Sequence, residues 1–398
     1  MSSTFPRALS VKLTKAELVG RAKEIAPGLA RRVRETETAR EPLKIAIQEL
    51  ADAQIFSILT PKMFGGHELH IDAMIDVVRI LSAADPSTAW VTAFYIGHAY
   101  RCALLAEKGQ RLIFADKPFA LGSGQAAPVL KVKKVSDGYV VTGRAAWSSG
   151  VMHADWVTFG GLYSNEGAPP EAMTFTMPIS DVKVLDTWYV EGMRGTGSND
   201  VMVEEVFVPE YMTLRTAGLM EGKSPGGELH ANPMYSLPLL PILLAEVAPV
   251  MAGIMRGAAD AFLSRTVGRM TTNTGVKVSN KQSTQMRAAR GLSAADCVDI
   301  LLDDYVHQLM SPSIGNKTDI KWRAAMKMRV STITNQCKLG VNDLMSGVSA
   351  NDFRSESPLQ RFFRDINMVS VHSFMDFDIA SESYGRALLG LPNEDPLL

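Results

Sequence analysis

The sequence predicts an α+β protein in which a helical region, a β region and a second helical region follow one another. Apolar residues recur at helical intervals over residues 12–115. Short alternating runs separated by Gly, Pro, Asn and Asp fill residues 121–208, which is typical of antiparallel strands. Helical intervals then return and continue to the end. We therefore expect an N-terminal helical domain, a central antiparallel β-domain and a C-terminal helical domain, at residues 1–119, 120–213 and 214–398.

The first helical region has clear start and stop signals. Thr14 precedes Glu17 by three residues, which is the spacing of a capping box. The stretch Pro61–Gly66 breaks the helical pattern, and Pro86–Thr88 caps a further helix expected at Ala89–Ala106. The aromatic residues of this last helix recur at helical spacing, which favours a role in the packed core.

The β region contains a hydroxyl-rich segment between two β-like runs. The segment is Trp147–Trp156, and it includes Ser148, Ser149 and Gly150. Hydroxyls and backbone amides at strand ends can bond the polar edge of a planar cofactor while an indole covers its face. A serine-glycine turn beside two core tryptophans explains the same residues. The local sequence leaves both interpretations open, and Trp147, Ser148 and Ser149 are the candidate cofactor-binding residues.

The C-terminal region is predicted to be helical throughout. Its helical stretches are Ile242–Met270, Ser283–Met310, Lys317–Asn351 and Pro358–Leu389. The apolar run Leu239–Met255 approaches the length that crosses a membrane. Because this run contains Glu246 and two prolines, we predict a buried helix and no contact with a membrane.

Charge and cysteine content disfavour several classes of function. Lys and Arg number 41 and Asp and Glu number 42, so no basic surface predicts nucleic-acid binding. The three cysteines, Cys102, Cys297 and Cys337, share no disulfide or metal spacing, which fits free thiols in a reducing cytoplasm. Met1–Arg7 lacks an apolar signal core, so we expect a cytoplasmic protein. No His, Cys or Glu spacing supports a metal site.

Two further motifs lack the structural context that their usual function requires. The glycines of Gly192–Ser198 suggest a nucleotide-binding loop, but a β-like run follows them instead of a helix. We interpret them as a tight turn whose backbone approaches a ligand or the N-terminal domain. Ser148 and Ser149 lack the Gly-x-Ser-x-Gly elbow of hydrolases. A Rossmann fingerprint and hydrolase chemistry are therefore both disfavoured.

His98 and His372 are candidate catalytic residues, because histidine transfers protons near neutral pH. A lone helical histidine is more often structural, so this interpretation competes with that of a satisfied buried histidine. Near the C-terminus, Arg361 and Asp365 are four residues apart and are expected to pair on one helix. His372 is expected to continue that helical segment, two turns beyond Arg364 and on a similar face.

Four motifs give the chain a resemblance to a known family over most of its length. They are Ser87–Trp90 with His98, Trp147–Gly150 with His153–Trp156, Trp188–Asn199, and Arg361–Asp365 with His372. The chain resembles the acyl-CoA dehydrogenase fold and, within it, the oxygenase components of two-component flavin-dependent (group D) aromatic monooxygenases. It is similar to secosteroid, hydroxyphenylacetate, dibenzothiophene and indole oxygenases of this group. The resemblance implies a C-terminal four-helix bundle and a homotetramer.

The resemblance also implies roles for individual residues. Ser149 matches the serine that bonds the flavin near N5 and its C4a-peroxide. His372 matches the late histidine beside that peroxide, and His98 matches the early histidine that faces the substrate. Arg269 is a weaker match for a basic residue that holds the flavin phosphate.

The implied reaction uses reduced flavin and O2. Reduced FMN or FAD would come from a separate flavin reductase, since the sequence has no NAD(P)H fingerprint. A flavin C4a-hydroperoxide would hydroxylate a small aromatic or heteroaromatic substrate such as an indole or a phenol. A serine hydroxyl can donate to the peroxide, and a histidine titrating near neutrality can supply a proton. Two alternatives stay open: an acyl-CoA dehydrogenase, although the usual Glu-Gly-Thr motif is missing, and a non-catalytic flavin-binding scaffold.

Overall fold

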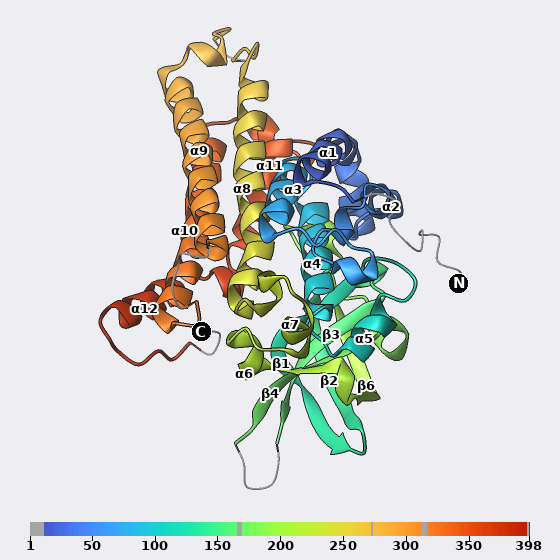
Figure 1. Cartoon of the computed structure of the whole chain (residues 1–398). Coiled ribbons are helices and arrows are strands. Elements are labelled where there is room, and N and C mark those ends of the chain that lie inside the picture. The colour runs from blue at the N-terminus through green and yellow to red at the C-terminus, as the bar shows by residue number, and fades with distance from the viewer. Residues whose placement is uncertain (1–11, 165–168, 272–273, 312–316, 396–397) are drawn as a thin grey trace.

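The computed structural model describes residues 12–164, 169–271, 274–311, 317–395 and 398, and its elements follow the predicted order of helices, strands and helices (Figure 1). The stretch Met1–Arg7 lies outside the described residues. The predicted capping box is confirmed, because the Thr14 side chain accepts from the backbone N–H of Glu17. The first helices are α1 (Lys15–Ala39), α2 (Lys44–Asp52), α3 (Ile71–Ala84), α4 (Pro86–Cys102) and α5 (Glu107–Ile113).

Strands β1 to β7 form one sheet in the order β5-β6-β2-β1-β3-β4-β7. Their bounds are β1 (Gly122–Val135), β2 (Gly138–Ser148), β3 (Trp156–Tyr163), β4 (Glu171–Pro178), β5 (Lys183–Leu185), β6 (Asn199–Pro209) and β7 (Thr213–Arg215). The expectation of a purely antiparallel sheet is wrong, because β1 and β3 run parallel. The chain leaves the β1–β2 hairpin beside the start of β1, where Trp156 pairs with Gly122, so β3 takes the direction of β1.

The C-terminal region contains the expected bundle. Helices α8 (Leu239–Thr266), α9 (Gln282–Met310) and α10 (Ile320–Ser346) pack against one another, and α11 (Pro358–Val369) packs against α8 and α10. Two short helices, α6 (Thr216–Met220) and α7 (Pro225–Leu229), precede the bundle. The predicted continuous helix to Leu389 is instead α11 and α12 (Phe377–Leu388), separated by a turn that contains His372.

Helix α8 connects the bundle to the N-terminal region. It packs against α3 and α4 as well as against its own bundle (Figure 1). Its length and composition would allow it to cross a membrane, but 94% of the relevant window is buried inside the protein. Leu240, Leu244 and Met251 are fully buried, as is expected of a helix that is apolar on every side. The prediction of a buried core helix is therefore confirmed.

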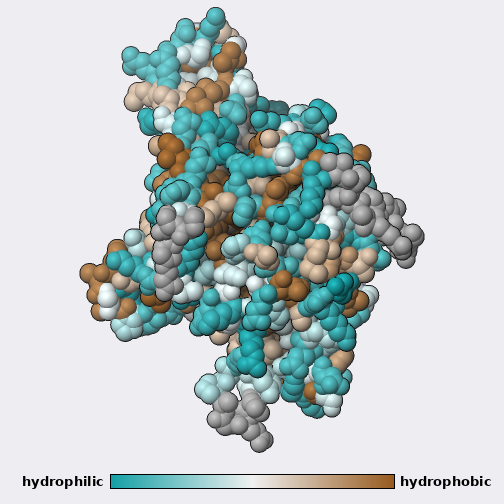
Figure 2. Space-filling view, in the orientation of Figure 1, coloured by the Kyte–Doolittle hydropathy of each residue, from teal (hydrophilic) through white to brown (hydrophobic). Residues whose placement is uncertain are grey.

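Apolar side chains also gather on part of the surface. Figure 2 shows a mostly hydrophilic face with hydrophobic residues over α12 and the chain that follows it. The large apolar residues exposed there are Phe377, Ile379, Leu388, Leu389 and Leu391. An exposed apolar group of this kind is suited to contact with another chain.

Candidate active site

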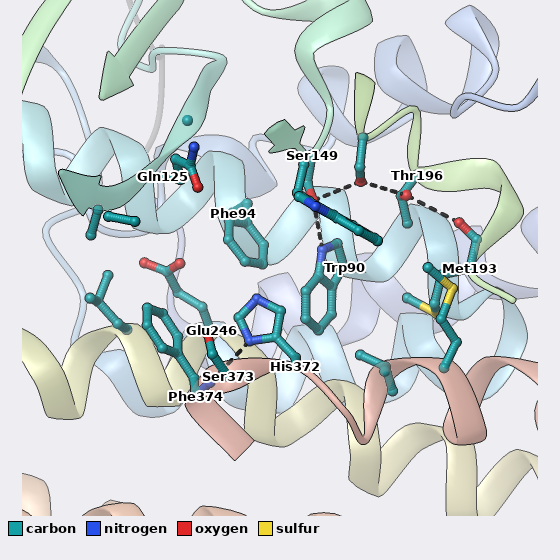
Figure 3. Close-up of a pocket in the computed structure, with 18 of the residues that line it drawn as sticks. Trp90, Phe94, Gln125, Ser149, Met193, Thr196, Glu246, His372, Ser373 and Phe374 are labelled. Atoms are coloured by element: carbon teal, nitrogen blue, oxygen red, sulfur yellow. Dashed lines mark hydrogen bonds between the residues drawn. The ribbon is translucent and has the colours of Figure 1, made fainter. Parts of the chain in front are cut away.

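A cavity of about 440 Å³ lies between the sheet, α4, α8 and the end of α11. Small-molecule sites have volumes of roughly 300–1,000 Å³. Figure 3 shows two sides of this cavity, with Trp90 and His372 between them. The hydroxyl side is lined by Trp147, Ser149, Trp188, Met193, Thr196 and Ser198. The charged side is lined by Phe94, Arg101, Gln125, Leu243, Glu246 and Phe374.

The turn after β2 fixes Ser149 on the hydroxyl side. Gly150 has a φ of +72°, a left-handed conformation that glycine adopts without strain. A Cβ at Gly150 would lie 2.6 Å from Val91 Cγ1, so glycine permits the close approach of the turn to α4. The Tyr95 hydroxyl donates to the Gly150 carbonyl at 2.5 Å. Trp147 also has a left-handed backbone, with φ +63°, and its ring lines the cavity while 61% of the residue stays exposed.

Four hydrogen bonds connect Trp90, through Ser149, to the loop before β6. The Trp90 Nε1–H donates to Ser149 Oγ at 3.0 Å. Ser149 Oγ lies 2.8 Å from Ser198 Oγ, which in turn lies 2.7 Å from Thr196 Oγ1. The Thr196 hydroxyl donates to the Met193 carbonyl at 3.1 Å. All three hydroxyl residues are buried, so these contacts form a continuous chain of hydroxyls shielded from water.

The two ends of this hydroxyl chain set the direction of the hydrogens between them. An indole N–H only donates and a carbonyl only accepts. Thr196 gives its hydrogen to Met193, so Ser198 is the donor to Thr196. Ser149 in turn donates its hydrogen to Ser198, so it offers the cavity only a lone pair. The sequence analysis expected Ser149 to donate to the flavin instead. The hydroxyl hydrogens can also all point the other way, towards Ser149. The Met193 carbonyl then loses the Thr196 hydroxyl but still accepts from the Thr196 N–H at 3.2 Å and the Trp188 Nε1–H at 3.3 Å.

The loop Gly192–Ser198 is held against the N-terminal region. A Cβ at Gly195 would lie 2.4 Å from Thr36 of α1, so the absence of a side chain permits this contact. The Gly195 N–H donates to Ser87 Oγ of α4 at 3.3 Å. The interpretation of these glycines as a tight turn that approaches the N-terminal domain is confirmed.

Asp365 anchors the same loop instead of pairing with Arg361 as predicted. The Met193 N–H donates to Asp365 Oδ1 at 2.6 Å. In the described part of the chain, Arg361 and Asp365 form no direct ion pair, although the Arg361 charge favours the Asp365 carboxylate electrostatically. Burial outweighs that effect and raises the pKa of Asp365 to about 6. Tertiary contact with the loop therefore replaces the expected bridge along the helix.

His372 follows α11 rather than extending it, because that helix ends at Val369. Its Nδ1 accepts from the Phe374 backbone N–H at 3.3 Å, which assigns the imidazole proton to Nε2. Burial lowers the pKa of His372 to about 4, so the ring is neutral at pH 7 instead of titrating near neutrality. The ring meets Trp90 edge to face at 5.7 Å between centroids. His372 thus offers the cavity a fixed N–H donor.

The charged side holds one carboxylate and one guanidinium. Glu246 of α8 is 1% exposed, and its Oε2 lies 3.8 Å from Arg101 Nη2 of α4. Gly97 makes room for the carboxylate, since a Cβ there would lie 2.0 Å from Glu246 Oε1. Burial raises the pKa of Glu246 to about 7, against the opposing effect of Arg101. Among the described residues, Glu246 Oε1 and the Nε and Nη2 of Arg101 have no hydrogen-bond partner.

Comparison with known proteins identifies the family. The sequence model of the acyl-CoA dehydrogenase C-terminal domain matches residues 245–377. The chain is 28% identical to the oxygenase component of an FADH2-dependent resorcinol hydroxylase of Rhizobium sp. (strain MTP-10005), over 94% of each chain. It is 47% identical to the pigment production hydroxylase of Rhodococcus sp. (strain ATCC 21145), over 97% of this chain and 100% of that protein. The chain belongs to the oxygenase components of two-component flavin-dependent monooxygenases.

A solved structure supports the fold of this oxygenase component. The crystal structure of 3-HSA hydroxylase from Rhodococcus sp. RHA1 matches with a TM-score of 0.89 at 28% identity, over 96% of this chain and 99% of that one. The predicted acyl-CoA dehydrogenase-like fold is confirmed, and so is the family suggested by the four sequence motifs.

The cavity of the oxygenase component fits a flavin. Ser149 can offer a lone pair or a hydrogen to the polar edge of the ring, according to the direction of the hydroxyl chain. His372 offers its Nε2–H. Trp147 and Trp188 meet edge to face at 5.4 Å and supply an indole surface for a planar ring. Among the described residues, no group of His, Cys, Asp and Glu is arranged to hold a metal ion.

His98, the residue expected to face the substrate, lies outside the cavity lining. It is 1% exposed and turns toward β1, where a Cβ on Gly122 would lie 2.5 Å from the His98 Cβ. Phe94, with its ring centroid 6.2 Å from the imidazole, lines the cavity. Burial and the Arg101 charge lower the pKa of His98 well below its usual value, so the ring is neutral. His98 is therefore not among the residues that line this cavity, and both of its ring nitrogens are buried without a hydrogen-bond partner among the described residues.

Ser148 and Arg269 also lie outside the lining. Successive side chains of a strand point to opposite faces, so Trp147 lines the cavity while Ser148 is buried away from it. Arg269 follows α8 and pairs with Asp352 at 2.7 Å. At about 1.5 Å per residue, the end of α8 is roughly 30 Å from Glu246. Within one chain, Arg269 is too far away to contact a ligand in this cavity.

The sequence predicted no individual site role for Trp90, Arg101 or Glu246, although Trp90 belongs to one of the four motifs. Helical spacing favours a core role for Trp90, yet its indole holds Ser149. Arg101 carries no sequence signal of its own. From the sequence, Glu246 was used only to predict that its apolar helix is buried and does not cross a membrane. The available signal was a single carboxylate inside an apolar helix, because such a group is seldom fully buried without a partner.

Proposed function

We propose that this oxygenase component uses reduced FMN or FAD and O2 to hydroxylate a small aromatic or heteroaromatic ring such as a phenol or an indole. The two-sided cavity carries the proposal. Its hydroxyl side, with Ser149 and the adjoining His372, suits the polar edge of a flavin. Its charged side, with Glu246 and Arg101, suits a polar group on a substrate ring. The relative named for resorcinol, a phenol, supports this substrate class.

The residues of the chain divide the work of this reaction. Bound reduced flavin supplies the electrons that activate O2. With flavin bound, Ser149 would hold the polar edge of its ring, and His372 would supply its Nε2–H as a hydrogen-bond donor to the reacting oxygen. Phe94, Leu243 and Phe374 form apolar walls that limit the access of water, which protects a reactive site from side reactions.

We infer that the reduced flavin comes from a separate reductase. The chain has no NAD(P)H fingerprint, and its family consists of oxygenase components of two-component systems. The purified chain is therefore expected not to oxidise NADH, even with flavin added. A cytoplasmic location is also proposed, because Cys102, Cys297 and Cys337 are all free thiols.

We further propose a homotetramer. The resemblance to the family motivates it, and the exposed apolar residues over α12 supply a surface that another copy could cover (Figure 2). Light scattering of the purified protein tests this directly. A mass of four chains is expected, and a monomer would contradict the proposal.

One assay separates the proposal from its two alternatives. The protein is mixed with photoreduced flavin, O2 and a panel of phenols, indoles and acyl-CoAs, and the products are identified by mass spectrometry. An oxygenated aromatic product supports the proposal. For the dehydrogenase alternative, the acyl-CoAs are also incubated anaerobically with the protein, oxidised flavin and an electron-accepting dye, and reduction of the dye would show a dehydrogenase. If no substrate reacts although flavin binds, the scaffold interpretation holds.

A further inference from the structure

The charged side of the cavity contains polar atoms that the protein leaves without partners. Glu246 Oε1 and the Nε and Nη2 of Arg101 are buried, and no hydrogen bond within the described residues reaches them. The two side chains come closest at Glu246 Oε2 and Arg101 Nη2, and this distance of 3.8 Å is longer than a hydrogen bond. Buried polar groups are nearly always paired, and Glu246 and Arg101 both line the cavity, so their atoms point to a ligand in that cavity.

Packing surrounds Glu246, and the ion pair with Arg101 at 3.8 Å leaves its Oε1 without a hydrogen bond among the described residues. Gly97 of α4 faces the carboxylate, and a Cβ there would lie 2.0 Å from Oε1. Leu243 stands one turn earlier on α8, and Phe94 and Phe374 complete the apolar walls (Figure 3). A polar group that enters this space can bond Glu246 or Arg101, while an apolar ring packs on the walls. The space therefore suits an aromatic ring with one polar edge.

Above its pKa of about 7, Glu246 is mainly ionised, and the signs of the two charges then decide which polar edge is preferred. The Glu246 carboxylate accepts hydrogen bonds, and the Arg101 guanidinium donates them. A neutral ring O–H or N–H can donate to Glu246, and its oxygen or ring face can accept from Arg101. A ring that carries a carboxylate would gain from Arg101 but place a second negative charge beside Glu246. Two neighbouring negative charges in a buried site repel each other strongly.

We propose that Glu246 and Arg101 form the substrate-recognition site, which selects neutral aromatic rings bearing an O–H or N–H donor over rings bearing a carboxylate. This inference rests on the proposed function and names its substrate class. It assigns to Glu246 the kind of substrate contact that the family resemblance implies for His98. Phe94 then packs on the ring, and Glu246 sets its orientation relative to the flavin.

The test measures binding without turnover. 4-Nitrophenol and 4-nitrobenzoate have similar size, and the first changes its absorption spectrum when it ionises. Each is titrated into the protein at pH 8, where Glu246 is mainly ionised, under anaerobic conditions with reduced flavin present, and binding is followed by absorption and calorimetry. We expect 4-nitrophenol to bind in its un-ionised form at least tenfold more tightly than 4-nitrobenzoate. Equal or tighter binding of 4-nitrobenzoate would overturn the proposal, and so would binding of neither ligand.

Variants locate the selectivity in the charged side. Glu246→Gln removes the negative charge and is expected to reduce the preference for 4-nitrophenol at least fivefold, mainly because 4-nitrobenzoate binds better. Asp260→Asn removes an exposed charge from the same helix and should leave the preference unchanged. An unchanged preference in Glu246→Gln would contradict the assignment. The wild-type comparison needs no variant, so it decides the case even if Glu246→Gln does not fold.

This binding test and the test of the proposed function fail independently. Selective binding of 4-nitrophenol without any oxygenated product would support the recognition site and contradict the monooxygenase proposal. Oxygenated products from carboxylate-bearing and neutral rings alike, without selective binding, would support the reaction and contradict the recognition site.

Discussion

The two sides of the cavity treat their polar atoms differently. On the hydroxyl side, Ser149, Ser198 and Thr196 all have hydrogen-bond partners within the protein. On the charged side, Glu246 and Arg101 keep buried atoms that have no partner in the described part of the chain. A paired group holds its geometry before a ligand arrives, whereas an unpaired buried group costs free energy until a ligand bonds it. The hydroxyl side is thus prepared for one cofactor, and the charged side is where substrates are distinguished.

The largest effect is expected at His372, which lies between the two sides. Losing a hydrogen bond to a developing charge typically costs about 10²–10³ in rate. His372→Ala should therefore reduce product formation by this order and increase H2O2 release per reduced flavin consumed. Both products are measured in parallel. His372→Gln keeps an amide N–H and should recover part of the coupling, whereas identical coupling in the two variants would argue against the donor role.

The next effect concerns stability and tests the cost of the charged side. The pKa of Glu246 is raised from 4.5 to about 7, so the folded state holds this proton more tightly than the unfolded state does. The resulting stabilisation of the fold is complete below pH 4.5 and is lost as the pH rises through 7. Glu246→Gln removes that loss. One pKa unit corresponds to about 1.4 kcal/mol. The variant should therefore have a free energy of unfolding at pH 8 that is higher by up to about 3 kcal/mol, with a far smaller difference at pH 5. Thermal unfolding at both pH values measures the difference, and destabilisation at pH 8 would contradict the expectation.

The smallest effect is expected on the hydroxyl side. Ser198→Ala removes the middle hydroxyl and leaves the Ser149 hydrogen without its partner. The loss of one buried hydrogen bond, about 1 kcal/mol, should weaken reduced-flavin binding roughly fivefold. Anaerobic titration followed by tryptophan fluorescence measures this affinity. Thr176→Val is the matched control, because it breaks the hydroxyl pair with Thr158 in the sheet. An equal loss of flavin affinity in this variant would contradict a special role for the hydroxyl chain of Ser149, Ser198 and Thr196.

Local sequence predicted the elements and part of the hydroxyl side. Thr14 and Glu17 form the capping box, and α4 begins at Pro86, because these signals act within a few residues. Ser149 was found because its serine-glycine turn is itself a local pattern. The parallel pairing of β1 with β3 was not predicted, since it depends on which edge of β1 the chain reaches after the hairpin.

The charged side could not be predicted in the same way. Glu246 and Arg101 are 145 residues apart and meet only because α8 packs on α4 beside Gly97. His98 illustrates the converse, since the family resemblance implied a substrate contact, yet it packs against Gly122 and is not among the residues that line the cavity. The direction of a side chain on a buried helix is decided by tertiary contacts, which the sequence of that helix does not contain.

The source of the oxygen in the product tests the central claim most directly. Wild-type protein is mixed with reduced flavin and a phenol or an indole under ¹⁸O2, and the product is analysed by mass spectrometry. Incorporation of one ¹⁸O atom into the ring, with none from labelled water, is the result expected of a flavin-dependent monooxygenase. A product whose new oxygen comes from water, or a substrate that is dehydrogenated without gaining oxygen, would contradict the account.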